Sequence, residues 1–265
     1  SDLAAVGACG QMHGTVLLDT DGELVVDRAM LWNDKRAQPQ VARFSHQQPP
    51  QPWLELLNNP PTAAWPAFKL AWLREHHPSQ WERIATVLMP KDYVNFRLCG
   101  VRATDYSEAS CYYLMDSATL QWSPEALRQF GLRADQLPAI HISSEVIGHI
   151  TPAAASVTGL PPGVPVVAGT ADMAATLLGS GVYQAGIASD STGTSTLLTV
   201  VSEHPLLSAG VNNLHLANSA WGGFTLLDAG GDAMRWARSA LNAGQLSHQQ
   251  MLDMAAEVPP GAEGL

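Results

Sequence analysis

The chain has 265 residues, 46% of them hydrophobic, and a formal net charge of −10. This length can form one large domain or two smaller ones, and the acidic balance excludes nucleic acid as an expected partner, because phosphate binding needs a basic surface. Apolar stretches all fall short of the ~20 residues that a membrane helix needs, so we expect no membrane partner. Three cysteines without the spacing of metal ligands (Cys9, Cys99 and Cys111) indicate reduced thiols and a cytoplasmic protein.

The N-terminal region is predicted to open with a hairpin. Its elements are a strand at 3–9, a strand at 15–18, a turn at 19–22 and a strand at 23–26. A Pro- and Gln-rich stretch at 38–61 is predicted as short helix mixed with loop. The next apolar repeat predicts an amphipathic helix that opens at Pro66 and stops before Pro78. The letters ATVLMPKDYVNFRLCG then predict a buried strand followed by a helix ending at Gly100.

A Pro- and Gly-rich segment, TGLPPGVPVVAG, introduces the second region. There a strand at 164–168 leads into a helix at 173–181, and the letters GIASDSTGT and STLLTVVS predict two further strands. Residues 222–241 predict a strand that turns into a helix. Because helices alternate with strands while strand pairs also adjoin, we expect an α/β fold with mixed sheets.

The first candidate site is the turn spelled GQMHG, which sets Met12 and His13 at the end of an apolar run. Two roles are open for this pair. In the first, His13 is a buried imidazole bonded to backbone and Met12 fills space beside it, which is the usual fate of buried polar groups. In the second, the pair faces a ligand.

The letters LWNDKR at 31–36 favour a ligand, because the chain has reversed by that point. Strand ends of one sheet then bring Trp32, Asn33 and Asp34 near His13. An aromatic surface beside polar donors and acceptors is what a sugar site needs. The alternatives are core packing for Trp32 and a weak surface ion pair between Asp34 and Arg36.

The second candidate site is Asp172, where the strand in PVVAGTADMAATLLGSG turns into a helix. An Asp at this position is most often an N-cap that accepts hydrogen bonds from free backbone N–H groups. The neighbouring small residues nevertheless leave open space around the carboxylate. A carboxylate in such a space can accept a proton from a hydroxyl within hydrogen-bond reach.

The third candidate site is the turn STGTS, which sets Gly193 and Thr194 among hydroxyl side chains. Several N–H and O–H donors at one turn suit a phosphate group. The alternative is an ordinary hairpin turn, where Gly, Ser and Thr are frequent. No Gly-Lys-Ser/Thr follows, so the turn is not a Walker loop.

Taken in order, these segments resemble the FGGY carbohydrate kinases, and xylulokinases most of all. The letters that carry the resemblance are GQMHGTVLLDTDGELVVDRAMLWNDKR, MPKDYVNFRLCGVRATDYSEAS, PVVAGTADMAATLLGSGV, STGTS and VPPGAEGL. They cover nearly the whole chain. The GQMHG and LWND pieces are the most specific.

The resemblance implies an actin-like ATPase fold with two ribonuclease-H-like lobes around a cleft. Residues 1–163 would form the sugar-binding lobe and residues 164–265 the start of the nucleotide-binding lobe. The implied activity is ATP-dependent phosphorylation of a ketopentose such as xylulose on a terminal hydroxyl, with magnesium accompanying ATP. The resemblance is compatible with a homodimer.

The resemblance also implies roles for individual residues. Asp172 matches the family's catalytic base, which deprotonates the sugar hydroxyl that attacks the γ-phosphate of ATP. Gly193 and Thr194 match a phosphate-binding turn for ATP. The sugar-facing positions would be Met12, His13, Trp32, Asn33, Asp34 and Met173.

This chain departs from the family pattern in two respects. Met173 stands where xylulokinases usually have Asn, which bears on the identity of the sugar. The chain also begins almost directly in an apolar run and stops after the turn-forming letters VPPGAEGL, so we expect a fragment. The family's first phosphate loop would lie upstream of Ser1 and its adenosine-binding loop downstream of Leu265, which predicts that the fragment alone is inactive.

Other functions compete with the kinase. The sugar can be L-xylulose, ribulose, glycerol or another polyol instead of D-xylulose. The chain can also be a non-catalytic sugar-binding fragment. A metal-dependent hydrolase that uses His13, Asp34 and Asp172 is a weaker alternative, because the sequence has no ligand spacing such as His-x-x-x-His.

Overall fold

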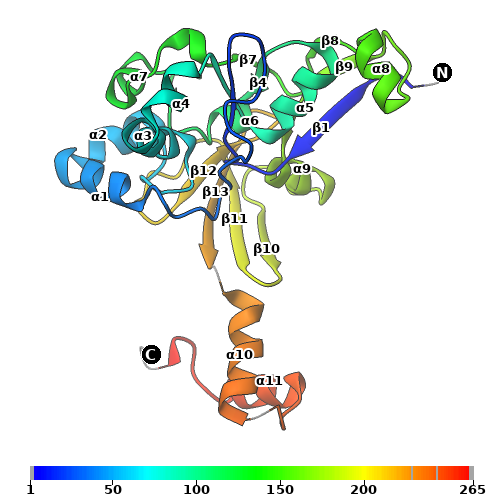
Figure 1. Cartoon of the computed structure of the whole chain (residues 1–265). Coiled ribbons are helices and arrows are strands. Elements are labelled where there is room, and N and C mark those ends of the chain that lie inside the picture. The colour runs from blue at the N-terminus through cyan, green and yellow to red at the C-terminus, as the bar shows by residue number, and fades with distance from the viewer. Residues whose placement is uncertain (1–2, 228, 243, 263–265) are drawn as a thin grey trace. The chain divides into compact units, whose positions relative to one another are not determined.

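The computed structural model describes residues 3–227, 229–242 and 244–262 (Figure 1). The chain divides into two compact units, one made of residues 1–188 and 200–224 and the other of residues 189–199 and 225–265. Among the described residues, no helix is long and apolar enough to cross a membrane.

The central sheet of the first unit has the strand order β1-β9-β8. Its strands are β1 (Val6–Gly10), β9 (Pro165–Ala171) and β8 (Val146–His149). β1 runs parallel to β9 (Figure 1), whereas β8 runs antiparallel to it, so the predicted mixed sheet is confirmed. The parallel pair matters for function, because it sends the residues after β1 and after β9 out of the same edge of the sheet.

Gly169 allows β1 and β9 to approach closely. Its φ of +74° lies in the left-handed region, and a Cβ at this position would collide with the backbone carbonyl of Ala8. The register between the strands shifts between Gly7 and Cys9, directly opposite. A glycine is therefore required where the two strands converge on their shared edge.

The first two predicted strands each pair with a distant part of the chain. β2 (Val16–Leu18) pairs antiparallel with β3 (Thr86–Leu88), whereas β1 pairs with β9. The physical reason lies between them: His13 has a φ of +66°, which turns the chain away from the central sheet.

The turn after β2 is confirmed in part. The N–H of Gly22 donates to the Asp19 carbonyl at 3.1 Å, and Val25 donates to Leu17 at 2.9 Å. Residues 23–26 are not a named strand, however, and join β2 only through the isolated bridge between Leu18 and Leu24.

Proline sets the start of most helices in the first unit. The predicted helix after Pro66 is confirmed as α3 (Pro66–His76), but it is not amphipathic, because its buried residues run without a break from Pro66 to Ala71. The predicted strand and helix before Gly100 are confirmed as β3 and α5 (Pro90–Cys99). Proline also opens helices α2 (Pro50–Leu57), α4 (Pro78–Arg83), α7 (Pro124–Phe130) and α8 (Pro152–Thr158). Proline suits the first helical position because its fixed φ fits and its missing N–H would be unpaired there anyway.

Aromatic side chains fill the core around α3. Phe44 of α1 (Gln38–Gln47) stacks on Phe130 with ring centroids 5.8 Å apart, and Phe68 meets Tyr113 at 5.2 Å. The smaller elements around this core are β4 (Ala103–Asp105), α6 (Tyr106–Ala109), β5 (Met115–Asp116), β6 (Gln121–Trp122), a 3₁₀ turn (Ala134–Gln136) and β7 (Ala139–His141).

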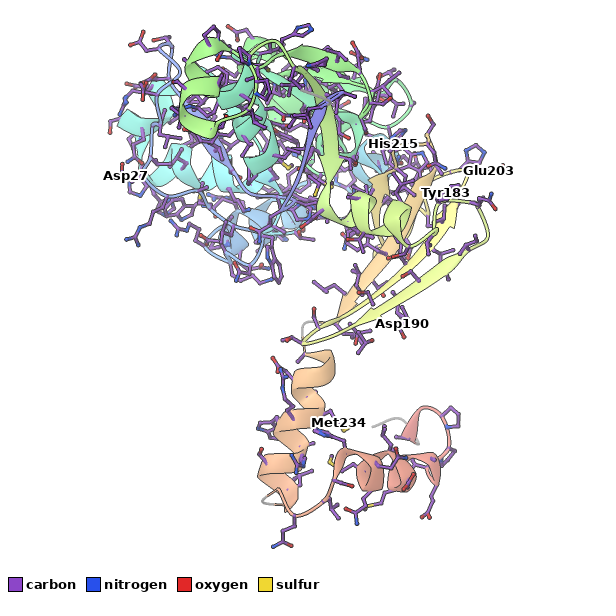
Figure 2. The ribbon with its side chains drawn as sticks, turned by 90° about the vertical axis from the view of Figure 1, so that its right-hand side faces the viewer. Asp27, Tyr183, Asp190, Glu203, His215 and Met234 are labelled. Atoms are coloured by element: carbon purple, nitrogen blue, oxygen red, sulfur yellow. The ribbon has the colours of Figure 1, made fainter. Side chains whose placement is uncertain are left out.

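The remainder of the chain follows the predicted order of a helix, two strands, then a strand and a helix. The helix after β9 is α9 (Asp172–Gly179). A four-stranded sheet has the order β10-β11-β13-β12, with β10 (Ala188–Thr192), β11 (Thr196–Ser202), β12 (Asn212–His215) and β13 (Trp221–Leu227). The last helices are α10 (Gly230–Asn242) and α11 (His248–Ala256); Figure 2 marks His215 on β12 and Met234 on α10.

Candidate active site

The shared edge of β1 and β9 brings two of the predicted sites together. Gly10 is in register with Ala171, so the GQMHG turn and Asp172 leave the sheet side by side. The backbone of Met12 lies near the Asp172 carboxylate and lowers the pKa of that carboxyl. The opening motif and the predicted base therefore belong to one site.

Asp172 is the first residue of α9, and the N-cap position before it is Ala171. The N-cap interpretation of Asp172 is thus wrong in position, although the carboxylate does accept the N–H of Met173 at 2.8 Å. Partial burial raises the pKa of Asp172, and the hydrogen bond from Met173 and the nearby backbone of Met12 only partly offset that rise. A carboxylate with a raised pKa is a stronger proton acceptor than an exposed one.

His13 is held in the left-handed conformation at the tip of the turn. Its N–H donates to Sδ of Met89 at 3.3 Å, and its ring meets the edge of Trp65 at 4.8 Å. Burial, helped by the nearby charge of Lys69, lowers the pKa of His13 to about 3. The ring is therefore neutral at physiological pH, and its buried Nδ1 has no hydrogen-bond partner within the described part of the chain.

Lys69 is a site residue that the sequence pattern did not reveal. It lies on α3 among apolar residues and is 0% exposed. Its Nζ donates to the carbonyl of His13 at 2.6 Å and to that of Met30 at 3.2 Å. Burial lowers the pKa of Lys69 to about 7, against the opposing charge of Asp34. The only signal in the sequence is a single cation within the apolar first half of the helix.

The LWND segment lies close to this lysine. Thr15 donates its N–H to Met30 at 3.1 Å, which anchors the segment beside the turn. Trp32 is half-buried and Asn33 exposed. Among the contacts of the described residues, none joins Trp32, Asn33 or Asp34 directly to His13.

Asp34 forms the ion pair that the alternative interpretation proposed. Its carboxylate accepts Nε of Arg36 at 2.9 Å and the Arg36 N–H at 3.0 Å. Burial alone would raise the pKa of Asp34, but the bonds and charge of Arg36 hold it below its usual value. Because the pair is partly exposed, its contribution to stability is small.

A second buried lysine fixes the end of β9 behind Asp172. Nζ of Lys91 contacts the carboxylates of Asp92 at 2.7 Å and Asp105 at 3.0 Å, and donates to the Ala168 carbonyl at 2.9 Å. All three charged side chains are 0% exposed. Although burial opposes its charge, the neighbouring carboxylates raise the pKa of Lys91, which therefore stays charged.

Ser107 extends this network to the residue before Asp172. Its hydroxyl donates to Asp105 at 2.6 Å and accepts the N–H of Ala171 at 2.9 Å. Glu108 beside it is fully buried, and neither carboxyl oxygen has a hydrogen-bond partner within the described residues. Burial, together with nearby negative charge, raises the pKa of Glu108 well above its usual value.

The STGTS turn belongs to the second unit. Gly193 and Thr194 are exposed between β10 and β11, and their carbonyls accept the N–H groups of Gly231 at 2.9 Å and Asp232 at 3.1 Å. The turn thus packs on the N-terminus of α10, so closely that a Cβ on Gly231 would collide with the Gly193 carbonyl. Asp190 stands just before the turn on β10 (Figure 2).

The metal-site alternative finds no matching geometry. Among residues 3–227, 229–242 and 244–262, no three His, Cys, Asp or Glu side chains gather as a ligand set. His13 and Asp34 instead have the separate environments described above.

Comparison with known proteins decides the family. A sequence model described as "FGGY family of carbohydrate kinases, N-terminal domain" matches residues 1–179. The chain belongs to the FGGY family of carbohydrate kinases. It is 33% identical over 270 residues to a xylulose kinase of Bacillus subtilis, covering 100% of this chain and 53% of that protein.

Other proteins are similar to this chain over nearly its whole length. An autoinducer-2 kinase of Salmonella paratyphi A is 30% identical over 277 residues, covering 99% of this chain and 52% of that protein. The crystal structure of a xylulose kinase from Rhodospirillum rubrum matches with a TM-score of 0.88 at 29% identity, covering 98% of this chain and 54% of that one. The actin-like ATPase fold expected for the FGGY family is thereby confirmed. The chain spans about half the length of these relatives.

Proposed function

We propose that this FGGY chain carries the sugar site and general base of an ATP-dependent kinase that phosphorylates a ketopentose such as xylulose on a terminal hydroxyl. One observation carries the proposal: Gly10 and Ala171 are in register at the shared edge of β1 and β9, so Met12 and Asp172 leave the sheet side by side. It joins the two motifs that the resemblance assigns to sugar and base.

In the proposed reaction Asp172 accepts the proton of the sugar hydroxyl. The hydroxyl oxygen forms a bond to the γ-phosphorus of ATP, while the bond from that phosphorus to its bridging oxygen breaks and ADP leaves. The raised pKa of Asp172 favours proton transfer, and the N–H of Met173 aims the carboxylate. Phosphoryl transfer depends mainly on such positioning and on charge neutralisation.

The sugar would be held by residues that the fold gathers around the GQMHG turn. Neutral His13 has an unpartnered Nδ1 that can accept a hydrogen bond from a sugar hydroxyl. Trp32, Asn33 and Asp34 would supply the aromatic and polar surface beside it. Met12 would border the sugar.

ATP would meet the chain at Gly193 and Thr194. The exposed turn and its hydroxyl neighbours are donors of the kind that phosphate oxygens need. Magnesium would accompany ATP and neutralise phosphate charge. Among the described residues, no set of three His, Cys, Asp or Glu side chains gathers as ligands for this ion. We propose that residues 1–163 form part of the sugar lobe and residues 164–265 part of the nucleotide lobe. Because each lobe is then incomplete, we expect no kinase activity from this chain alone.

The identity of the sugar depends on Met173. Its N–H donates to the Asp172 carboxylate, and its side chain is buried. Where xylulokinases usually have an amide, this chain therefore lacks one hydrogen-bonding group. L-xylulose, ribulose, glycerol and other polyols stay as alternatives, because losing one such group can redirect specificity.

A coupled ADP-release assay on the full-length protein, over a panel of ketoses and polyols, tests the proposal. We expect ATP turnover that depends on a ketopentose. Binding of a sugar without turnover would favour the non-catalytic alternative. The mass of the purified natural protein checks the same point: the kinase predicts about twice the 28.3 kDa of this chain.

A further inference from the structure

We infer that Lys69 is a positioning residue of the sugar site: its ammonium joins the His13 turn to the LWND segment and so sets the shape of the surface that receives the sugar. This inference rests on the proposed function. The juxtaposition that carries it is one buried Nζ between the carbonyls of His13 and Met30.

The two carbonyls belong to the two halves of the proposed sugar surface. His13 lies in the turn, and Met30 stands two residues before Trp32. Met30 also accepts the N–H of Thr15, so the lysine reinforces the point where the two segments already meet. A shift of either segment would lengthen one of the two Lys69 bonds.

His13 needs such a restraint. A non-glycine residue with a φ of +66° is strained and persists only where its surroundings hold it. The other bonds at this residue are weaker: its N–H donates to a thioether sulfur, and the Thr15 hydroxyl reaches its carbonyl at 3.4 Å. The Lys69 bond at 2.6 Å is the strong one.

Stability alone does not explain a lysine here. Lys69 is 0% exposed, and no carboxylate among the described residues forms an ion pair with it. Asp34, the acidic group that acts on it, is already paired with Arg36. A buried amine without an ion-pair partner is costly whether it keeps its charge or loses its proton, and an apolar side chain of similar length would pack at lower cost. What Lys69 provides is a fixed position for the two carbonyls.

The test uses the full-length protein with Lys69→Met, which keeps the length of the side chain and removes its donors. We expect the KM for the sugar to rise about 10-fold or more, because both hydrogen bonds from Nζ of Lys69 are lost. The KM for ATP should stay within about 2-fold of wild type, since the lysine acts on the sugar side only. Isothermal titration with the sugar alone should show the same loss of affinity.

Leu70→Ala is the matched control, because Leu70 is the neighbouring fully buried residue of α3 and its side chain has no hydrogen-bond donor. It should lower the melting temperature and leave the KM for the sugar unchanged. If Lys69→Met instead changes only the melting temperature, or raises both KM values equally, Lys69 is structural and the inference fails. Lys69→Gln keeps one donor and should give an intermediate KM; failure of both variants to fold would also overturn the inference. Absence of sugar-dependent turnover in the wild type would instead overturn the proposed function.

Discussion

Replacing His13 by Ala in the full-length protein perturbs the proposed sugar surface at a residue with a left-handed backbone conformation. The imidazole is 8% exposed, packs against Trp65 and carries the unpartnered Nδ1. Alanine removes the acceptor and the ring together. It also tolerates the left-handed φ of +66° less well than His does.

The magnitude follows from these two losses. One hydrogen bond to a neutral acceptor contributes about 1 kcal/mol, which corresponds to a rise of about 5-fold in the KM for the sugar. Deleting a buried ring costs roughly 2 kcal/mol or more of unfolding free energy, because the neighbouring Trp65 cannot fill the space fully. We therefore expect weaker sugar binding and a lower melting temperature, with the KM for ATP unchanged.

His13→Asn separates the two effects. Asn accepts left-handed backbone readily, so this variant should recover part of the lost stability. Its carboxamide is shorter than the imidazole and should not restore sugar affinity. The assay is steady-state ADP release with sugar and ATP varied in turn, beside thermal unfolding of each variant. If the KM values for sugar and ATP rise together, or if only the melting temperature falls, His13 is a core residue and the reasoning is refuted.

Two further predictions concern Lys91 and Glu108, the buried ionisable residues near Asp172. Lys91→Met should lower the unfolding free energy by about 3–5 kcal/mol in urea titrations, because Asp92 and Asp105 are left buried without their cation; an unchanged midpoint would contradict the network. Glu108→Gln should become more stable relative to wild type as pH rises above the usual Glu pKa. A carboxyl whose pKa is raised on folding loses stability as pH rises toward that pKa, and Gln does not titrate; parallel pH–stability curves would disprove the assignment.

Local signals in the sequence predicted much of the fold. Pro66 and Pro90 open helices, and Gly100 with a φ of +76° closes one, because these residue types act on their own backbone. The pairing of β1 with β9 could not be predicted from such signals. It depends on contacts between parts of the chain that lie far apart in the sequence.

The candidate site was predictable to the same extent. The Met12–His13 pair and Asp172 stand out at strand ends, and the family resemblance already assigned them to one site. Lys69 and Lys91 did not stand out, because their roles depend on carbonyls and carboxylates from other segments. The sequence around a buried lysine does not indicate which groups that lysine will contact in the fold.

The most direct test of the central claim is kcat of Asp172→Asn in the full-length enzyme, at saturating sugar and ATP. The Asn oxygen can still accept the N–H of Met173, so the fold and the sugar affinity should persist. An amide cannot take the hydroxyl proton at neutral pH, so we predict a fall in kcat of roughly 100-fold or more. A kcat close to that of the wild type would show that the base is another residue and would contradict the account.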